Sequence, residues 1–321
     1  GTAHLDTQWR WTIQDTINTH IKNTLDDNFS RFANYPHYVF SFEGAFRYML
    51  MKEYYASRYV QLKNYINLGR WAVAGSTLEN GDTNIIAPES LIRQALIGNN
   101  FFEDEFSKRS TDIFLPDCFG FSYTMPTWMS HCGLNGFSSQ KLSWGSAIPV
   151  PFDIGLWKGP DGSSVVAALK PGNYVNTISN DLSNDSAWLT TINNLGNNYG
   201  VYAGYKYFGV GDVGGAPTTG SCNWLEQSII GTGPITVVSA RSDQLFNDLT
   251  PSQKAGLPVY NGELLMAVHA TGCYTSQAAM KRWNRQNEQL AHAAERASVM
   301  AGWLGSAAYP QQKLNEAWIR F

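Results

Sequence analysis

The chain has 321 residues, enough for one large α/β domain or two smaller ones with a buried core. Its 23 Lys and Arg residues stand against 26 Asp and Glu residues, and charged residues make up only 15% of the chain. This balance lacks the basic footprint of a protein that binds a nucleic-acid backbone, so we predict no nucleic-acid partner. Because no run approaches the roughly 18 apolar residues of a membrane span, we also predict no such span.

Aromatic residues make up 13% of the chain and include 11 Trp. Many of these Trp stand beside Gly, Asn or Ser, which suits a surface that stacks on sugar rings. Packing inside a barrel core explains any single Trp equally well. The cysteines lie far apart, without the CxxC spacing of a structural zinc site, and we interpret all four as incidental buried thiols: Cys118, Cys132, Cys222 and Cys273.

Short β-prone runs alternate with amphipathic stretches along most of the chain. Strands followed by helices are typical of a parallel sheet or a (β/α) barrel, so we predict an α/β fold. The predicted strands lie at residues 38–42, 71–74, 113–115, 165–169, 205–210 and 235–238.

Two helices are predicted more firmly than the others. A run from Pro88 begins with Pro and Glu, which favour a first helical turn, and its apolar residues recur on one face. A second run, 276–304, contains no Pro and would span roughly 45 Å, which suits a helical bundle better than a barrel. We therefore predict a catalytic domain at 1–270 and the start of a bundle at 271–321, with a second bundle helix at 311–321.

Three acidic residues share one sequence context. Asp6, Asp117 and Asp212 each follow an apolar run at the point where a strand would end. The carboxyl ends of the strands in a (β/α) barrel converge on one face, so we expect these carboxylates to meet in space.

His4 and Asp6 are two positions apart, which places both side chains on the same face of an extended strand. An imidazole and a carboxylate on one face form half of a tetrahedral or five-coordinate metal site. Taken alone, His-x-Asp fits an ordinary exposed terminus better than a metal site.

The segment around Asp212 contains the pattern GxGxxG through Gly209, Gly211 and Gly214. A dinucleotide site needs a helix directly after these glycines and an acidic residue about 20 positions later. The residues that follow are GAPTTG, which do not start a helix, so we disfavour this interpretation.

Six motifs, in order, resemble glycoside hydrolase family 38, the class II α-mannosidases. They read AHLDTQWRW, GSTLENGDTNIIAPESLIRQ, FLPDCFGFSYTMPTWM, QKLSW, GVGDVGGAPT and HATGCYTSQAAMKRWNRQNE. The resemblance runs over almost the whole chain. It implies a seven-stranded (β/α) barrel-like catalytic domain followed by a three-helix bundle and further β domains.

The resemblance also implies a zinc-dependent retaining α-mannosidase that acts on mannose-containing oligosaccharides. His4, Asp6 and Asp117 fall on the metal-ligand positions for one zinc ion per chain, or another divalent ion. Asp117 also falls on the nucleophile and Asp212 on the general acid/base. The substrate-binding positions match Trp9, Phe119, Lys141, His269 and Tyr274.

The family's fourth metal ligand is a histidine that the resemblance places beyond Phe321. We therefore expect the chain to be a fragment of a longer polypeptide, with a metal site that is recognisable but incomplete. Glu79, Asp82, Glu89 and His131 fit structural roles better than site roles. Two alternatives remain open: a metal-dependent carbohydrate deacetylase, and an inactive family member that only binds mannose.

Overall fold

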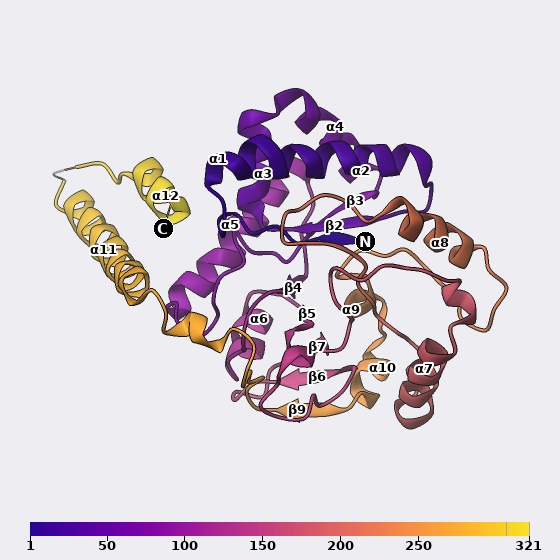
Figure 1. Cartoon of the computed structure of the whole chain (residues 1–321). Coiled ribbons are helices and arrows are strands. Elements are labelled where there is room, and N and C mark those ends of the chain that lie inside the picture. The colour runs from indigo at the N-terminus through magenta and orange to yellow at the C-terminus, as the bar shows by residue number, and fades with distance from the viewer. Residues whose placement is uncertain (306, 321) are drawn as a thin grey trace.

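The structure, a computed structural model, describes residues 1–305 and 307–320. In this part of the chain the strands form two sheets with helices packed around them (Figure 1). The first sheet has the order β3-β2-β1-β8 and the second the order β4-β5-β7-β6-β9. The strands are β1 (Thr2–Ala3), β2 (Phe40–Glu43), β3 (Trp71–Ala74), β4 (Asp112–Phe114), β5 (Gly136–Ser138), β6 (Ile154–Lys158), β7 (Ser164–Ala168), β8 (Gly209–Val210) and β9 (Val259–Asn261).

Helices connect most of these strands. The α-helices are α1 (Ile13–Asp15), α2 (Lys22–Asn34), α3 (Ala45–Tyr54), α4 (Ala56–Asn67), α5 (Pro88–Phe106), α6 (Met125–His131), α7 (Ser186–Tyr199), α8 (Thr219–Ile229), α9 (Gln244–Asp248), α10 (Pro251–Gly256), α11 (Ala278–Trp303) and α12 (Gln311–Arg320). The π-helix η1 (Thr16–Ile21) joins α1 to α2. The short 3₁₀ helices are η2 (Lys141–Trp144), η3 (Leu182–Asn184) and η4 (Thr271–Tyr274).

Strand direction is the feature that positions the site. All paired strands of the first sheet run parallel, so β1, β2, β3 and β8 end at the same edge. In the second sheet β6 runs antiparallel to β7, and the other pairs are parallel. The carboxyl end of β4 lies near that of β1, because Asp117, which follows β4, has its Oδ2 3.6 Å from Nε2 of His4, which follows β1.

The α/β class is confirmed, but the closed seven-stranded barrel is not found in the described residues. Between the two sheets there is no continuous ladder: the chain at 201–208 is irregular, and β6 with β7 forms an antiparallel pair. The packing follows this division. One apolar cluster covers the first sheet and includes Phe40 and Trp71, and another covers the second sheet and includes Phe137 and Trp157.

Four of the six predicted strands are present within two residues of their predicted bounds, as β2, β3, β4 and β7. The run 205–210 contributes only the short strand β8. The prediction of a strand at 235–238 is wrong: this segment is irregular, and its Ile235 and Val237 are apolar because they cover the first core. Strands β5, β6 and β9 had not been predicted, because runs of only three to five residues show no clear period.

Helix α5 begins at Pro88 as predicted. Its Gly98 lets the helix lie directly on the chain after β3, because a Cβ at this position would approach the carbonyl oxygen of Ser76 to 2.4 Å. No helix in the described residues has both the length and the apolar character needed to cross a membrane.

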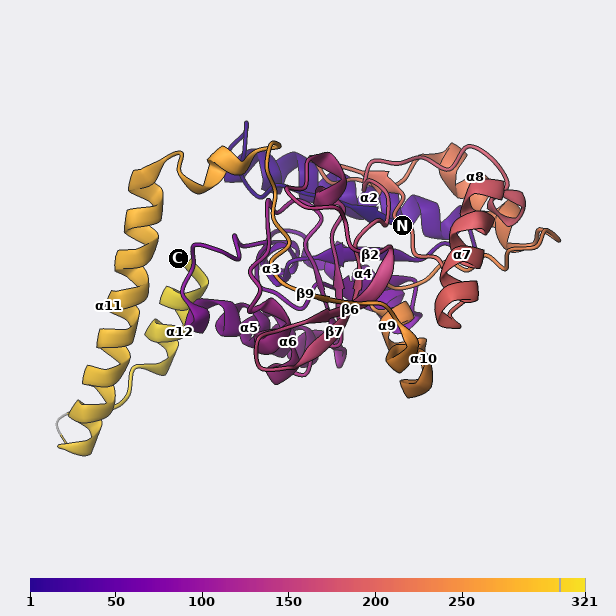
Figure 2. The same cartoon turned by 90° about the horizontal axis from the view of Figure 1, so that it is seen from below.

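The predicted helices near the C-terminus are also present, as α11 and α12, although Phe321 lies outside the described residues. In both views they extend as an arm beside α5 (Figures 1 and 2). The arm is attached through Arg93 of α5, which pairs with Glu295 at 2.9 Å and lies 4.0 Å from the Trp318 ring centroid.

The prediction of four buried thiols is only partly right. Cys118 and Cys222 are buried and Cys132 is half-buried, but Cys273 is exposed. It lies in the 3₁₀ turn η4 that leads to α11, outside both cores. All four cysteines are free, in agreement with their scattered spacing.

Candidate metal and catalytic site

Three strand ends bring the predicted site residues together. His4 and Asp6 follow β1, Asp117 follows β4, and Asp212 follows β8. Beyond the strands the chain continues to pair, because His4 N–H donates to the Val210 carbonyl and Asp6 N–H to the Asp212 carbonyl, both at 2.9 Å. This backbone pairing brings the carboxylates of Asp6 and Asp212 close to each other.

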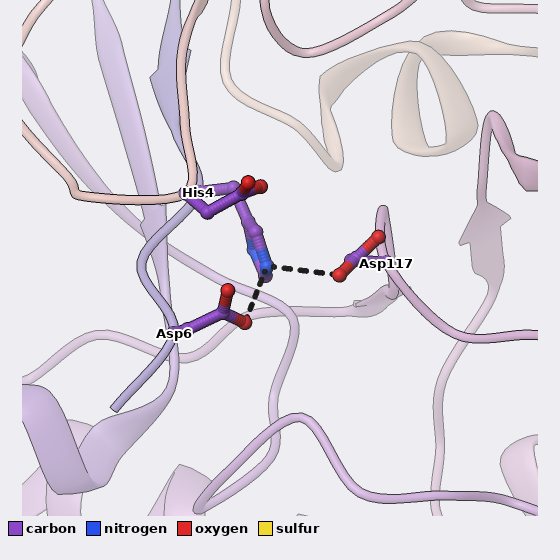
Figure 3. A group of neighbouring side chains, drawn as sticks. His4, Asp6 and Asp117 are labelled. Atoms are coloured by element: carbon purple, nitrogen blue, oxygen red, sulfur yellow. Dashed lines mark hydrogen bonds and ion pairs between the residues drawn. The ribbon is translucent and has the colours of Figure 1, made fainter. Parts of the chain in front are cut away.

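His4 lies at the centre of the cluster and is only 2% exposed. Its Nε2 is 3.2 Å from Asp6 Oδ1 and 3.6 Å from Asp117 Oδ2, as Figure 3 shows. One candidate ligand atom from each of His4, Asp6, Asp117 and Asp212 lies within 4.8 Å of the others. The expected convergence of the three strand-end carboxylates is therefore observed, and His4 joins them.

Glu43, at the end of β2, contacts the other ring nitrogen of His4. Its Oε1 is 3.1 Å from His4 Nδ1 and also accepts a hydrogen bond from Asn80 at 3.1 Å. Glu43 is fully buried. Burial alone would lower the pKa of His4, but the carboxylates of Asp117, Asp6 and Glu43 raise it well above its ordinary value. With Nδ1 bound to Glu43, Nε2 is the ring nitrogen that faces the cluster, and it must lose its proton before it can bind a cation.

Lys141 contacts Asp117 and is 1% exposed. Its ammonium forms an ion pair with Asp117 Oδ1 and lies 3.7 Å from the ring centroid of Trp144 and 5.4 Å from that of Phe119. Burial acts to raise the pKa of Asp117, but His4 and Lys141 hold it below its ordinary value. Asp117 is therefore an ionised carboxylate with its second oxygen near His4.

Asp212 has a different partner. The hydroxyl of Tyr174 donates to Asp212 Oδ1 at 2.5 Å, and the Tyr174 ring lies 5.0 Å from the His4 ring. Burial and the nearby Asp212 raise the pKa of Tyr174 far above its ordinary value, so its hydroxyl remains a donor.

Two of these residues had escaped the sequence analysis. Glu43 carries the same signal as the predicted acids, since it ends the β-prone run 38–42, and the strand-end criterion would have found it. Tyr174 lies in an irregular segment after β7, where no pattern of the sequence singles it out.

The predicted substrate-binding residues differ in burial and in the contacts that they make. Trp9 is 55% exposed, and its ring is 6.0 Å from that of Trp11. Phe119 and His269 are half-buried, with ring centroids 5.8 Å apart. Tyr274 donates its hydroxyl to the carbonyl of Gly120, next to Phe119, at 3.1 Å. Lys141, described above, faces Asp117.

The acids that the sequence analysis set aside have local partners. Glu79 pairs with Arg47 at 2.8 Å and accepts from Thr7 at 2.5 Å, which supports the segment after Asp6. The carboxylate of Asp82 accepts from the Asn84 N–H, and Glu89 pairs with Arg93 one helical turn later. His131 lies on the surface near Asp161.

The donor set fits a divalent cation. Four carboxylates, those of Asp6, Glu43, Asp117 and Asp212, lie around His4, and the Lys141 ammonium pairs with Asp117. An imidazole nitrogen and carboxylate oxygens that converge in this way are ligands that zinc accepts, and a bound cation would offset the excess negative charge. Figure 3 shows Asp6 and Asp117 directed toward the same nitrogen of His4.

Comparison with known proteins identifies the family. Residues 1–263 match the glycosyl hydrolases family 38 N-terminal domain, and residues 268–320 match the alpha mannosidase middle domain. The chain belongs to glycosyl hydrolase family 38. The resemblance in the sequence motifs is thereby confirmed.

Several family 38 relatives align with nearly the whole chain. Human alpha-mannosidase 2C1 (Homo sapiens) is 30% identical over 99% of the chain, and alpha-mannosidase G of Dictyostelium discoideum is 33% identical over 92%. The chain spans only 30% and 26% of the lengths of these relatives. An alpha-mannosidase structure from Enterococcus faecalis superposes over 99% of the chain and 37% of its own, with a TM-score of 0.75 and 18% identity, which shows a shared fold.

Proposed function

We propose that this family 38 chain carries the active site of a zinc-dependent retaining α-mannosidase that hydrolyses mannose-containing oligosaccharides. The observation that supports it best is the convergence of His4, Asp6, Asp117 and Asp212 within 4.8 Å at the strand ends. The names of the relatives supply the sugar, because the side chains alone specify a glycosidase-like site without naming mannose.

His4, Asp6 and Asp117 would hold one zinc ion or another divalent ion. When bound, the metal supplies electrostatic stabilisation and a template for sugar hydroxyls. Glu43 fixes the orientation of His4, and Lys141 holds Asp117 in place from the opposite side. These contacts order the ligands before a cation arrives.

A retaining glycosidase needs two carboxyl groups about 5 to 5.5 Å apart. In the proposed mechanism the Asp117 carboxylate attacks the anomeric carbon while Asp212 gives its proton to the leaving oxygen, so that the glycosidic bond breaks. The Asp212 carboxylate then takes a proton from water, and the water oxygen displaces Asp117. The nearest oxygens of the two side chains lie within 4.8 Å, which supports this assignment over an inverting one.

The remaining site residues would bind the sugar. We propose that Trp9 and Phe119 offer aromatic faces, with Lys141, His269 and Tyr274 as polar contacts. We further propose that residues 1–270 form the catalytic domain and that α11 and α12, within 271–321, are the first two helices of a three-helix bundle.

The test uses the protein as its source organism makes it. We expect turnover of p-nitrophenyl α-mannoside that is abolished by Asp117→Ala and by a chelator, and restored when zinc is returned. Asp153→Ala is the matched control, since Asp153 pairs with the half-exposed Lys170 at 3.2 Å outside the cluster. Activity that survives both treatments would refute the proposal.

A carbohydrate deacetylase remains the alternative enzyme class. Such a reaction needs no second carboxylate poised to protonate a glycosidic oxygen. Release of acetate that is unaffected by Asp212→Asn would therefore favour it, and metal and mannose binding without either activity would indicate an inactive family member.

A further inference from the structure

Tyr174 makes the side-chain contact that distinguishes the two catalytic carboxylates. Its hydroxyl donates to Oδ1 of Asp212 at 2.5 Å, whereas Asp117 is bound by the cationic side chains of Lys141 and His4. An oxygen that accepts a short hydrogen bond is a poor place for an acidic proton. The proton that Asp212 delivers would therefore be carried on Oδ2.

The position of Tyr174 is fixed on several sides. The residue is 4% exposed, and its backbone N–H donates to Gln140 Oε1 at 2.5 Å. The ring packs on His4 and lies over Gly211, where a Cβ would approach Tyr174 Cε2 to 2.4 Å. Gly211 therefore makes room for the ring directly beside the backbone that carries Asp212.

A second role for Asp212 must be distinguished from this one. Its carboxylate is close enough to His4, Asp6 and Asp117 to act as another metal ligand. A donor such as Tyr174 occupies Oδ1 of this carboxylate and fixes the plane of the group. Both effects favour an acid that points one oxygen at the leaving group over a ligand that turns toward a cation.

We propose that Tyr174 is a positioning residue for the general acid/base: it holds Oδ1 of Asp212 so that Oδ2 faces the glycosidic oxygen. This inference rests on the proposed glycosidase function. Tyr174 itself touches neither the reacting bond nor the attacking carboxylate in this mechanism.

Substrates with different leaving groups test the proposal, because a good leaving group departs without a proton. We measure kcat/KM, which reports the first, glycosylation half-reaction, for 2,4-dinitrophenyl α-mannoside and for an α-linked mannobiose. General acid catalysis contributes about 10²- to 10⁴-fold. Tyr174→Phe should therefore lower kcat/KM at least about tenfold for mannobiose and less than about twofold for the dinitrophenyl substrate.

The control variant Tyr48→Phe removes another buried tyrosine hydroxyl, which donates to the Phe42 carbonyl at 2.8 Å in the core of the first sheet. It should affect both substrates equally. Equal losses for Tyr174→Phe, or no loss, would overturn the inference, with thermal unfolding and metal content showing that the variant is folded.

Asp212→Asn separates a failure of the inference from a failure of the proposed function. If Asp212→Asn shows the strong dependence on leaving group and Tyr174→Phe does not, only the positioning role of Tyr174 is wrong. If Asp212→Asn shows no such dependence, the acid assignment fails, and the inference fails with it.

Discussion

Glu43 offers a direct test of how the metal site is ordered. It is fully buried, and a single oxygen of its carboxylate accepts hydrogen bonds from His4 and Asn80, each at 3.1 Å. Glu43→Gln keeps the size of the side chain but replaces a charged acceptor with a neutral amide, which can also turn its NH₂ toward His4 Nδ1. In the parent protein the Glu43 charge orients the imidazole and raises the basicity of its Nε2, and the variant lacks this charge.

The expected magnitude follows from this contact. Removal of a carboxylate that orients a metal-ligating histidine costs about 10- to 100-fold in metal affinity, which corresponds to about 1.4 to 2.8 kcal/mol. Glu43→Gln should therefore weaken zinc binding within this range in a competition titration against a coloured chelator. Asp6→Asn, which removes a proposed ligand, should weaken binding further.

Glu79→Gln provides the matched control. Glu79 is half-buried beside the same segment, but its carboxylate pairs with Arg47 and accepts a hydrogen bond from Thr7 rather than from His4. We expect its zinc affinity to stay within about twofold of the parent protein. Affinity of Glu43→Gln that stays equally close to the parent, while Asp6→Asn is impaired, would refute an orienting role for Glu43.

Two further predictions concern stability. Burial and the nearby Asp243 raise the pKa of Asp112 from 3.8 to about 7, so the folded protein holds this proton more tightly than the unfolded chain does. The stability from this proton is complete below about pH 4 and is lost as the pH rises to about 7. Of this loss, about 3 kcal/mol falls between pH 5 and pH 8, and Asp112→Asn should remove it when urea unfolding is measured at these two pH values. An unchanged pH dependence would contradict it. Gly136→Ala places a Cβ 1.9 Å from Phe246 Cδ2, and this overpacking should lower the free energy of unfolding by about 1 to 3 kcal/mol; a variant as stable as the parent would contradict it.

The sequence predicted the convergence of the site because strand ends carry that information. Asp6, Asp117 and Asp212 each follow a β-prone run, and His4 is two positions before Asp6. Parallel strands whose carboxyl ends share one edge bring such residues together. This convergence does not depend on how the sheets close. The convergence of these residues could therefore be predicted although the described residues do not form a closed barrel.

Other features depend on contacts that no local pattern encodes. The run 235–238 is β-prone because Ile235 and Val237 cover a core, and composition alone does not separate a covering segment from a strand. The run before β8 is irregular although Tyr207 and Phe208 are buried in it. Each of these errors concerns what a segment packs against.

The division of labour among the carboxylates also depends on such contacts. Asp6 and Asp212 are tied by one backbone hydrogen bond, from the Asp6 N–H to the Asp212 carbonyl, so any change in the pairing of β1 with β8 moves a proposed ligand and the proposed acid together. What separates their roles is the set of partners beyond the backbone. In the proposed mechanism Lys141 keeps Asp117 ionised for attack, while Tyr174 leaves one oxygen of Asp212 free to carry a proton. Strand-end positions thus bring four similar side chains together, and neighbours distant in the sequence make them chemically different.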